Sequence, residues 1–436
     1  MNGGTTQIFY ASTLYGAATL AAAIDSGCFR PAGRRVLLVS TNAAVPETTT
    51  ALDRMPGFER LRGRFDEVLN WNETIEPLHP GGWTPRPDDL PLLQRHLRRL
   101  WALGTDRVEL VVESLQVAPA LTIAQLFPDA PIDVYADGLM SYGPTRNKID
   151  PLVGERVRRL LHLDLVPGLA PLLLAEFGAV PETVPTAAFT KVVEELSGPA
   201  ATEEGPALLL GQYLAALSLL TPEEEGELHL RMVRGAVARG HRRLVFKPHP
   251  TAPDAWSKAL VREAEALGAE LTVLDRPVLA EVLYRELRPA LVVGCFSTAL
   301  FTASAFYGIE AARVGTRSLL TRLSPYQNSN RVPVVLVDAL VPDLEGSGRE
   351  PMGLPQLESL VTAVGFAMQP KVRPDLREAA VRHLSGPLAA PTRHHFTRRR
   401  LTSLGLPGGL PVPRHPGLRR LARRALRLKR RALGGR

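Results

Sequence analysis

Residues 289–307 have the sequence PALVVGCFSTALFTASAFY, which defines the unit from which the fold is built. The apolar run at residues 290–294 predicts a buried strand, and residues 298–307 predict a helix that begins beside a Ser-Thr pair. The same order of strand, turn and helix recurs on both sides of this stretch. Such alternation is typical of parallel sheets with crossover helices, so we expect an α/β fold.

The alternation occurs in two blocks that are separated by a segment rich in small, proline and acidic residues, the linker candidate 197–206. Before it we expect strands at 7–10, 36–40, 108–112 and 132–135, and helices at 14–25, 91–103 and 119–126. After it we expect strands at 207–211, 243–247, 271–274 and 290–294, and helices at 222–239, 254–267, 278–287 and 298–307. The two blocks predict two Rossmann-like lobes, residues 1–198 and 206–390, with a ligand cleft between them.

The charge of the chain is unevenly distributed. Its 436 residues include 52 Lys and Arg against 44 Asp and Glu, a formal charge of +8. Residues 391–436 contain 14 basic residues and no acidic ones, so the first 390 residues carry 38 basic and 44 acidic side chains, a formal charge of −6. Because nucleic-acid-binding domains spread a basic face over the fold itself, we expect no nucleic-acid partner, and we expect a separate basic C-terminal tail at residues 391–436.

Features missing from the sequence disfavour several classes of protein. Cys28 and Cys295 are the only cysteines, and no cluster of His, Cys and carboxylate residues has metal spacing, so we expect neither disulfides nor a metal site. No apolar run reaches the roughly 18 residues of a spanning helix, and no basic segment precedes residues 8–23 as in a signal peptide. The glycine patterns of dinucleotide-binding and Walker loops and the GxSxG elbow of hydrolases are also missing.

Two short motifs follow predicted strands of the second block. Two prolines hold His249 directly after the strand at 243–247, where its ring can donate to a phosphate or protonate a leaving group, although a structural role stays open. Ser297 and Thr298 precede the next helix, where a capping hydroxyl contributes about 1 kcal/mol. The same hydroxyls and the free N–H groups of the helix also suit a phosphate, and the two interpretations are compatible.

A third motif, Ala136-Asp137-Gly138, follows the strand predicted at 132–135 in the first block. An Asp at a strand exit can act as a general base on an acceptor hydroxyl. Asp-Gly is also one of the commonest turn dipeptides, so a plain turn is the alternative. Since an open α/β sheet places its ligands at the carboxyl ends of its strands, all three motifs are expected at the cleft.

In this order, the Asp137-Gly138, His249-Pro250 and Ser297-Thr298 pairs resemble the acidic-acidic-Gly, His-Pro and Ser-Ser/Thr motifs of bacterial sialyltransferases. The layout of residues 7–384 is most similar to the bacterial α-2,8-polysialyltransferase-like family. This resemblance implies a GT-B-like arrangement of the two lobes. One departure is Ala136, which stands where the family motif has its first acidic residue, so the catalytic base is assigned to Asp137.

The resemblance also implies a metal-independent, inverting glycosyltransferase that moves sialic acid from CMP-sialic acid to a hydroxyl of a glycan, with no cofactor besides the donor. Asp137 would deprotonate the acceptor hydroxyl, and His249 would stabilise or protonate the departing CMP. The implied donor-binding residues are Ser297, Thr298, Glu281, Lys247 and Gly138. Glu281 would hold the donor ribose, with an exposed helix charge as the alternative, and Gln212 is a further cleft position.

Two other functions stay open on the same residues. A CDP-glycerol glycerophosphotransferase-like enzyme also releases CMP and also uses a GT-B-like fold with His-Pro and Ser-rich sites. A non-catalytic GT-B-like protein would bind a glycan or a partner without needing Asp137 or His249 for chemistry. Release of CMP from CMP-sialic acid or from CDP-glycerol distinguishes these functions.

The tail contains ten Arg and Lys among residues 414–436, with Leu and Ala at roughly helical spacing. A basic amphipathic helix is typical of a segment that binds an anionic membrane surface, to which each Lys or Arg contributes about 1 kcal/mol. Nucleic-acid binding by the tail and a solvated run of charges are the alternatives. We therefore expect a cytoplasmic protein that is peripheral at the inner face of the membrane, where a lipid-linked acceptor glycan would suit it.

Overall fold

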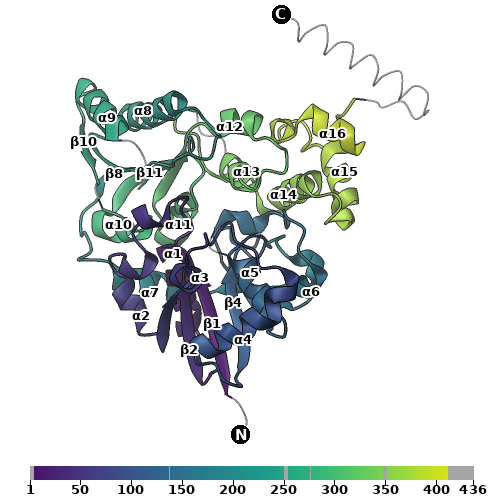
Figure 1. The fold of residues 1–436 in the computed structure, drawn as a ribbon. Coiled ribbons are helices and arrows are strands. Elements are labelled where there is room, and N and C mark those ends of the chain that lie inside the picture. Colours follow the sequence, from purple (N-terminus) through teal and green to yellow (C-terminus); the bar gives the residue numbers. More distant parts are fainter. Residues whose placement is uncertain (1–3, 137, 250–253, 275, 347–350, 411–436) are drawn as a thin grey trace, which may run out of the picture.

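The computed structural model of the chain has two α/β lobes, with a group of C-terminal helices beside the second lobe (Figure 1). The structure describes residues 4–136, 138–249, 254–274, 276–346 and 351–410. Each lobe is built on one sheet of parallel strands with helices on its faces, which confirms the predicted α/β, GT-B-like architecture of two Rossmann-like lobes.

The first lobe contains a seven-stranded sheet in the order β3-β2-β1-β4-β5-β6-β7. Its strands are β1 (Thr5–Ala11), β2 (Arg34–Val39), β3 (Glu67–Asn70), β4 (Arg107–Glu113), β5 (Ile132–Ala136), β6 (Val157–Leu163) and β7 (Val180–Val184). In the central strand β1, Phe9 packs into the core on one face of the sheet, while Ile8 and Tyr10 pack into the core on the other. Burial on both faces explains the apolar run at residues 8–11 of β1.

Helices cover both faces of this sheet. One face packs against α1 (Leu14–Asp25), α2 (Phe58–Arg62) and α7 (Thr186–Leu196), and the other against α3 (Trp71–Ile75), α4 (Leu90–Leu100), α5 (Ala120–Leu126) and α6 (Pro151–Gly154). The connecting 3-10 turns are η1 (Pro46–Thr48), η2 (Leu52–Arg54), η3 (Pro87–Asp89), η4 (Leu139–Tyr142) and η5 (Ala175–Phe177). α1 begins directly after β1 because the Thr13 hydroxyl accepts a hydrogen bond from the Gly16 N–H at 2.9 Å.

The second lobe contains a five-stranded sheet in the order β10-β9-β8-β11-β12. Its strands are β8 (Gly205–Leu210), β9 (Arg243–Lys247), β10 (Glu270–Val273), β11 (Pro289–Gly294) and β12 (Glu310–Arg313). Its helices are α8 (Pro222–Ala238), α9 (Asp254–Ala266), α10 (Ala280–Leu287) and α11 (Ala299–Tyr307). Thr221 and Glu224 form a reciprocal capping box that fixes the start of α8.

The C-terminal helices lie beside the second lobe (Figure 1). They are α12 (Thr316–Arg322), α13 (Arg331–Leu340), α14 (Leu354–Met368), α15 (Arg377–Ser385) and α16 (Arg398–Leu404), with the turns η6 (Pro374–Leu376) and η7 (Arg393–His395). Leu401 of α16 is fully buried, and Nε of Arg400 donates to the carbonyl oxygen of Ala367 on α14 at 2.6 Å. The tail boundary predicted at residue 391 therefore falls inside a packed segment. Residues 411–436, the rest of the predicted tail, lie outside the described residues.

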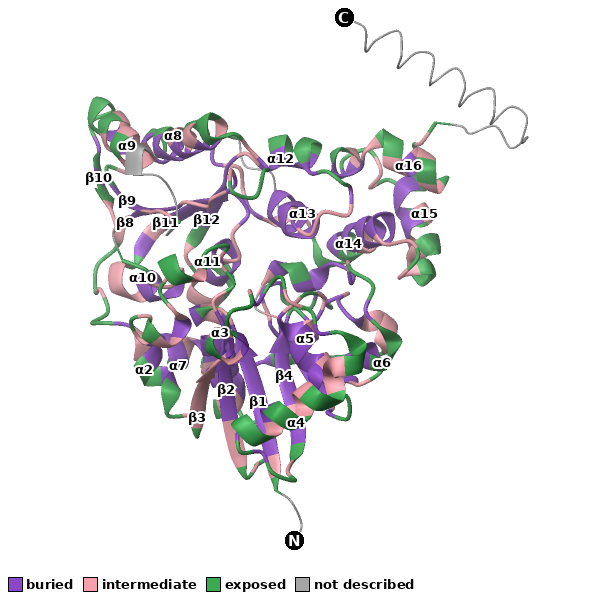
Figure 2. Ribbon diagram, viewed as in Figure 1, coloured by how far each residue is buried: buried purple, intermediate pink, exposed green. Residues whose placement is uncertain are grey.

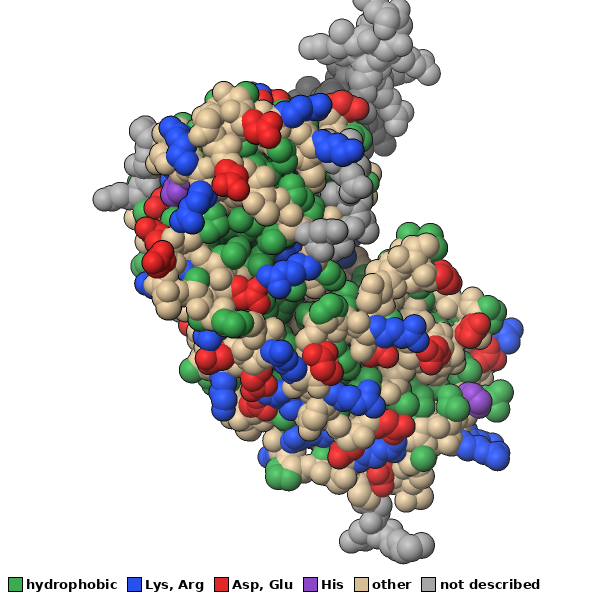
Figure 3. Space-filling model, turned by 90° about the vertical axis from the view of Figure 1, so that its left-hand side faces the viewer, with side chains coloured by type: hydrophobic (Ala, Val, Ile, Leu, Met, Phe, Trp, Pro, Cys, Tyr) green, Lys and Arg blue, Asp and Glu red, His purple; other side chains and the backbone are tan. Residues whose placement is uncertain are grey.

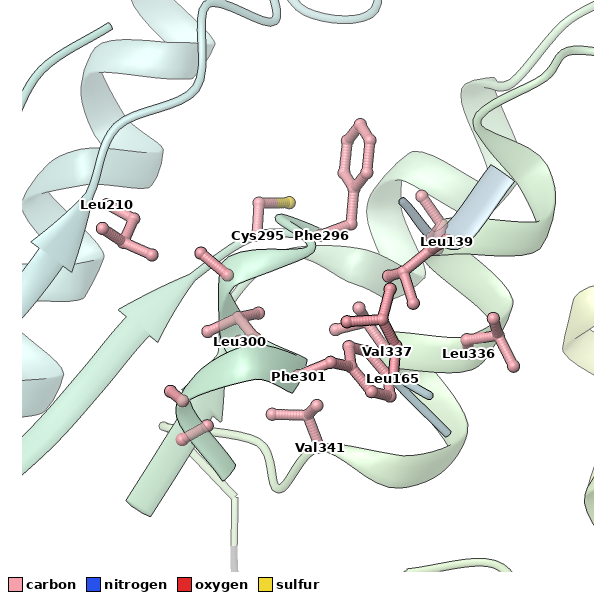
Figure 4. Close-up of a cluster of buried hydrophobic side chains, with 14 of the residues drawn as sticks. Leu139, Leu165, Leu210, Cys295, Phe296, Leu300, Phe301, Leu336, Val337 and Val341 are labelled. Carbon is pink, nitrogen blue, oxygen red and sulfur yellow. The ribbon is translucent and has the colours of Figure 1, made fainter. Parts of the chain in front are cut away.

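The two lobes share one hydrophobic core. Leu139 and Leu165 of the first lobe belong to the same cluster as Leu336 and Val337 of α13 and Phe301 of α11 (Figure 4). Because this contact removes apolar surface from water, the lobes are held together by burial as well as by the connecting chain.

The strands and helices expected from the sequence all occur, with their ends shifted by at most three residues. The sequence did not indicate the strands β3, β6, β7 and β12 or the helices α2, α3, α6, α7 and α12 to α16. No helix or strand occurs at residues 197–204, within the linker candidate. The central strands of both sheets are buried, as Figure 2 shows.

The surface carries both signs of charge. On the face shown in Figure 3, Lys and Arg side chains are interspersed with Asp and Glu side chains, as expected for a mildly acidic body. Among the described residues, no helix combines the length and the apolar character that crossing a membrane requires.

Candidate active site between the two lobes

A cavity of about 700 Å³ lies between the two lobes. The first lobe lines it with residues that follow β1, β4 and β5, and the second with residues that follow β8, β9 and β11. It is therefore the cleft expected at the carboxyl ends of parallel strands. The sequence-predicted residues on its walls are Gly138, Lys247, His249, Glu281, Ser297, Thr298 and Gln212.

Lys247 and His249 reach the cavity from the end of β9. Burial lowers the pKa of Lys247, and the charge of Glu281 opposes this shift. His249 is exposed as a residue, and the centroid of its ring lies 6.0 Å from that of Tyr213. Partial loss of solvent around the ring, followed by the charge of Lys247, lowers the pKa of His249. The imidazole is therefore largely neutral at pH 7 and keeps one N–H to donate.

Glu281 lies in the first turn of α10 and is only 2 % exposed. Its Oε1 accepts a hydrogen bond from Oγ1 of Thr302 on α11 at 2.6 Å. Burial raises the pKa of Glu281, whereas the hydrogen bond from Thr302 and the charge of Lys247 act to lower it. The alternative of an exposed helix charge is wrong, because this face of α10 packs against α11. A carboxyl group held at the cavity wall in this way can accept hydrogen bonds from sugar hydroxyls.

Ser297 and Thr298 follow β11, and their hydroxyls have different partners. Oγ of Ser297 accepts a hydrogen bond from the N–H of Ala299 at 3.2 Å and so caps the first turn of α11. Oγ1 of Thr298 accepts a long hydrogen bond from the N–H of Leu139 in the first lobe, at 3.4 Å. Ser297 thus satisfies the first N–H of α11. Thr298 is the N-cap residue, but its hydroxyl bonds across the cleft and not to the helix.

Gly138 allows the two lobes to approach each other at this point. Its backbone is extended, with φ of −168°, which any residue can adopt. A Cβ atom at Gly138 would lie 2.8 Å from Oγ1 of Thr298, which is too close for an unstrained contact. Asp137, the predicted base, lies outside the described residues, and its neighbours Ala136 and Gly138 both line the cavity.

The loop after β8, residues 212–215, is held from two sides. Oε1 of Gln212 accepts a hydrogen bond from the N–H of Phe296, in the turn after β11, at 2.8 Å. The buried carboxylate of Glu225 on α8 accepts from two consecutive N–H groups of the loop, at 2.7 Å each. Gln212 therefore links the exits of β8 and β11. Tyr213, beside it, is a wall residue that the sequence analysis missed.

A buried carboxylate that the sequence analysis also missed supports the wall of the first lobe. Glu113 ends β4 and accepts hydrogen bonds from the hydroxyls of Ser12 and Tyr135, the latter at 3.0 Å. Tyr135 lies two residues before Asp137, so this network fixes the end of β5 from which the Asp-Gly motif leaves. The sequence carried one signal for Glu113, namely a carboxylate at the end of the strand predicted at 108–112.

Arg146 is a cation on the first-lobe wall of the cavity. Gln116 accepts a hydrogen bond from its N–H, and its carbonyl oxygen accepts one from Nε2 of Gln369 at 2.7 Å. Within the part of the chain that the structure describes, no acidic side chain forms an ion pair with its guanidinium. Arg146 can therefore bind an anionic group inside the cavity.

Comparisons with solved structures gave matches of low sequence identity. Phytolacca americana UGT2 is 14% identical, with 86% of this chain and 94% of that chain covered and a TM-score of 0.43. The UDP-GlcNAc 2-epimerase of Methanocaldococcus jannaschii is 10% identical, with 81% and 97% covered and a TM-score of 0.44. MurG of Acinetobacter baumannii is 14% identical, with 89% and 97% covered and a TM-score of 0.38. No conclusion about function follows from likenesses this distant.

A comparison with curated proteins gave no match. A family model described as alpha-2,8-polysialyltransferase (POLYST) matches residues 7–316. The match runs from β1 to the start of α12 and includes the three motifs that suggested the resemblance. Because it spans more than two thirds of the sequence, the chain belongs to the alpha-2,8-polysialyltransferase family of glycosyltransferases.

Proposed function

We propose that the chain transfers sialic acid from CMP-sialic acid to a hydroxyl of a glycan acceptor, with inversion at the anomeric carbon and without a metal ion. The observation that carries this proposal is the cavity in which Gly138 of the first lobe faces Lys247, His249 and Thr298 of the second. A site between lobes lets a donor held by one lobe meet an acceptor held by the other. Membership of the alpha-2,8-polysialyltransferase family supports sialic acid as the sugar.

The donor phosphate is proposed to bind beside His249, Lys247 and the start of α11. The neutral imidazole of His249 donates an N–H, while Lys247 and the N-terminus of α11 supply positive potential. The phosphate gains negative charge as its bond to the sugar breaks, and groups already in place around it stabilise that charge. One cation, a neutral N–H donor and a helix end can therefore serve where a metal ion would otherwise be needed.

The donor ribose is proposed to bind Glu281. Its carboxyl group is held by Thr302 and lies on the same cavity wall as Lys247. Because Lys247 and Glu281 carry opposite charges, each favours the ionised state of the other in this partly buried setting. The carboxyl oxygens then accept hydrogen bonds from the ribose hydroxyls.

Asp137 is proposed to be the general base. The acceptor oxygen attacks the anomeric carbon opposite CMP, its proton passes to the Asp137 carboxylate, and the bond to the phosphate oxygen breaks with its electron pair on CMP. The products are the new glycoside, CMP and protonated Asp137. Glu113 acts indirectly, because its hydrogen bond from Tyr135 fixes the strand end before this loop.

The test is CMP release from CMP-sialic acid and from CDP-glycerol in the presence of glycan acceptors. We expect release from CMP-sialic acid, undiminished by EDTA, and a product of inverted anomeric configuration by NMR. Release only from CDP-glycerol, or from neither donor, would overturn the proposal in favour of a glycerophosphotransferase or a binding protein.

Two pairs of variants test the assigned roles. Asp137→Asn should reduce CMP release on the order of 10²-fold, as expected for a group that acts in proton transfer. His249→Ala should reduce it on the order of 10²-fold as well, because it removes a donor to the charge that develops on the leaving phosphate. The matched controls are Asp129→Asn, an exposed residue before β5, and His241→Ala, in the turn before β9. Equal activity in all four variants would contradict the assigned chemistry.

We also propose that the basic residues 411–436 bring the enzyme to an anionic membrane surface at its cytoplasmic face, where a lipid-linked acceptor would be accessible. Co-sedimentation with vesicles tests this. The full chain should bind anionic vesicles, and a chain ending at residue 410 should not. Equal binding to neutral vesicles, or none to either kind, would refute the proposal.

A further inference from the structure

A second group of polar side chains lies outside the lining of the cavity. Asp338 belongs to α13, and His394 and His395 belong to η7. The Nε2 atoms of His394 and His395 lie 2.7 and 3.1 Å from the same carboxylate oxygen, Oδ2 of Asp338. One ligand atom from each of the three residues lies within 4.8 Å of the others, a spacing that one metal ion can bridge.

Hydrogen bonds from outside the group hold two of its members, His395 and Asp338. Nδ1 of His395 faces the carbonyl oxygen of Thr392 at 3.1 Å, and in the neutral tautomer that carries its proton on Nδ1 the lone pair of Nε2 is available to an ion. Oδ1 of Asp338 accepts a hydrogen bond from Oγ1 of Thr316 at 2.8 Å, which leaves Oδ2 to face the imidazoles. Histidines and carboxylates that bind metal ions are commonly held by such outer hydrogen bonds.

The local charges also favour a cation. The guanidinium of Arg313 lies 3.3 Å from Oδ1 of Asp338 and 2.8 Å from Oδ2 of Asp343. One positive side chain is therefore shared by two carboxylates, so this group retains a net negative charge. The Asp338 and His395 side chains are 1 % and 2 % exposed, whereas that of His394 is 31 % exposed. An ion can enter from the His394 side, where water can complete its coordination.

We propose that Asp338, His394 and His395 bind a zinc ion, with solvent at its fourth position. Zinc bonds of about 2.0–2.1 Å at tetrahedral angles place ligand atoms about 3.3 Å apart, so the observed 2.7 and 3.1 Å require only small outward shifts. Two imidazoles and one carboxylate suit zinc better than they suit calcium or magnesium, which prefer oxygen ligands. The ion joins η7 to α13 and so fixes the segment that carries α16 to the second lobe.

The proposal is tested on the full chain after removal of bound metal with a chelator. Isothermal titration with Zn²⁺ should give one ion per chain, and Tm should rise on binding. Co²⁺ at the same site should give visible d–d absorption. His394→Ala removes a partly exposed ligand and should weaken Zn²⁺ binding roughly tenfold or more. His96→Ala, which changes an exposed histidine of α4, is the matched control and should bind as the wild type does.

Asp338→Asn provides a second variant, with circular dichroism to show that it is folded, and it too should lose Zn²⁺ binding. His249→Ala should keep it, because His249 lies in the cavity and not in this group. Absence of Zn²⁺ binding by the folded wild type would overturn the proposal and leave a hydrogen-bonded cluster. Unchanged affinity in His394→Ala, or loss of binding in His249→Ala, would overturn it as well.

Discussion

Oγ1 of Thr298 in the second lobe accepts a hydrogen bond from the backbone N–H of Leu139 in the first lobe, with 3.4 Å between the two atoms. The contact joins the Ser-Thr motif to the residue that follows the Asp-Gly motif. Gly138 makes it possible, because a larger residue there would meet Thr298. The relative placement of donor and acceptor therefore depends on the missing side chain of Gly138, and not on its backbone angles, which any residue can adopt.

Gly138→Ala should push Thr298 away and misplace the two motifs relative to each other. Because small displacements at a reacting centre are costly, we expect kcat/KM for CMP-sialic acid to fall about tenfold or more. Gly63→Ala is the control, since no atom lies within 4 Å of a Cβ at that position, and its kinetics should be unchanged. The same clash should lower the Tm of Gly138→Ala, and adding Thr298→Ala, which removes the clashing hydroxyl, should restore it. A double variant that keeps the lowered Tm would contradict the steric explanation.

Glu281→Gln should raise the KM for the donor about tenfold, because a hydrogen bond to a charged group is worth about 1.5–3 kcal/mol. Thr302→Val removes the supporting hydrogen bond to Glu281, together with a 3.2 Å contact to the carbonyl oxygen of Ala299, and should have a smaller effect on KM. Glu358→Gln, at an exposed position of α14, should have none. A fall in Tm without any change in KM would show that Glu281 serves the fold alone.

Lys247→Gln should raise the pKa of His249, because the positive charge of Lys247 contributes to its depression. The rise should be partial, since loss of solvent around the ring is the larger cause and remains. Titration of the imidazole C–H signals by NMR measures this, with Lys191→Gln on α7 as the remote control. An unchanged pKa in Lys247→Gln would show that the two groups do not interact.

Stability should depend on pH through His229. Burial lowers the pKa of His229 to about 4, and within the described residues its ring nitrogens have no hydrogen-bond partner. The unfolded chain binds a proton at this histidine near pH 6.5, whereas the folded chain binds it only near pH 4. The free energy of unfolding is therefore at its full value above pH 6.5. As the pH falls from 6.5 toward 4, the free energy of unfolding decreases by about 3 kcal/mol at most.

His229→Phe keeps a ring against Phe246 and Trp256 and should flatten this dependence. Chemical denaturation between pH 4 and pH 7 measures the free energy of unfolding. His96→Phe, at an exposed position, should keep the pH profile of the wild type. Identical profiles for wild type and His229→Phe would rule out this histidine as the source.

Most inner strands could be predicted because burial on both faces gives them apolar runs. The inner strand β6, VRRLLHL, was missed because two arginines and a histidine interrupt its apolar run. Edge strands lack this signal. β3, β7 and β12 lie at sheet edges, and the five residues of β7, VPETV, are mostly exposed and include a proline. Only the packed sheet shows that such segments are strands.

The site could be predicted where chemistry follows a strand exit, as for His249 and the Ser-Thr pair. It could not be predicted where partners come from distant parts of the chain. Leu139 and Thr298 are 159 residues apart, and Asp338 and His394 are 56 apart. The burial of Glu281 likewise depends on how α10 packs against α11, which helix periodicity does not specify.

The core shared by Leu139, Leu165, Leu336 and Val337 also limits how substrates can enter. A wide hinge opening of the lobes would expose this apolar contact to water at each turnover. Small sliding of packed helices and movement of the loops at the mouth of the cavity avoid that cost. We therefore expect substrates to enter and products to leave through movements at the rim of the cavity, while the contact between the lobes stays closed.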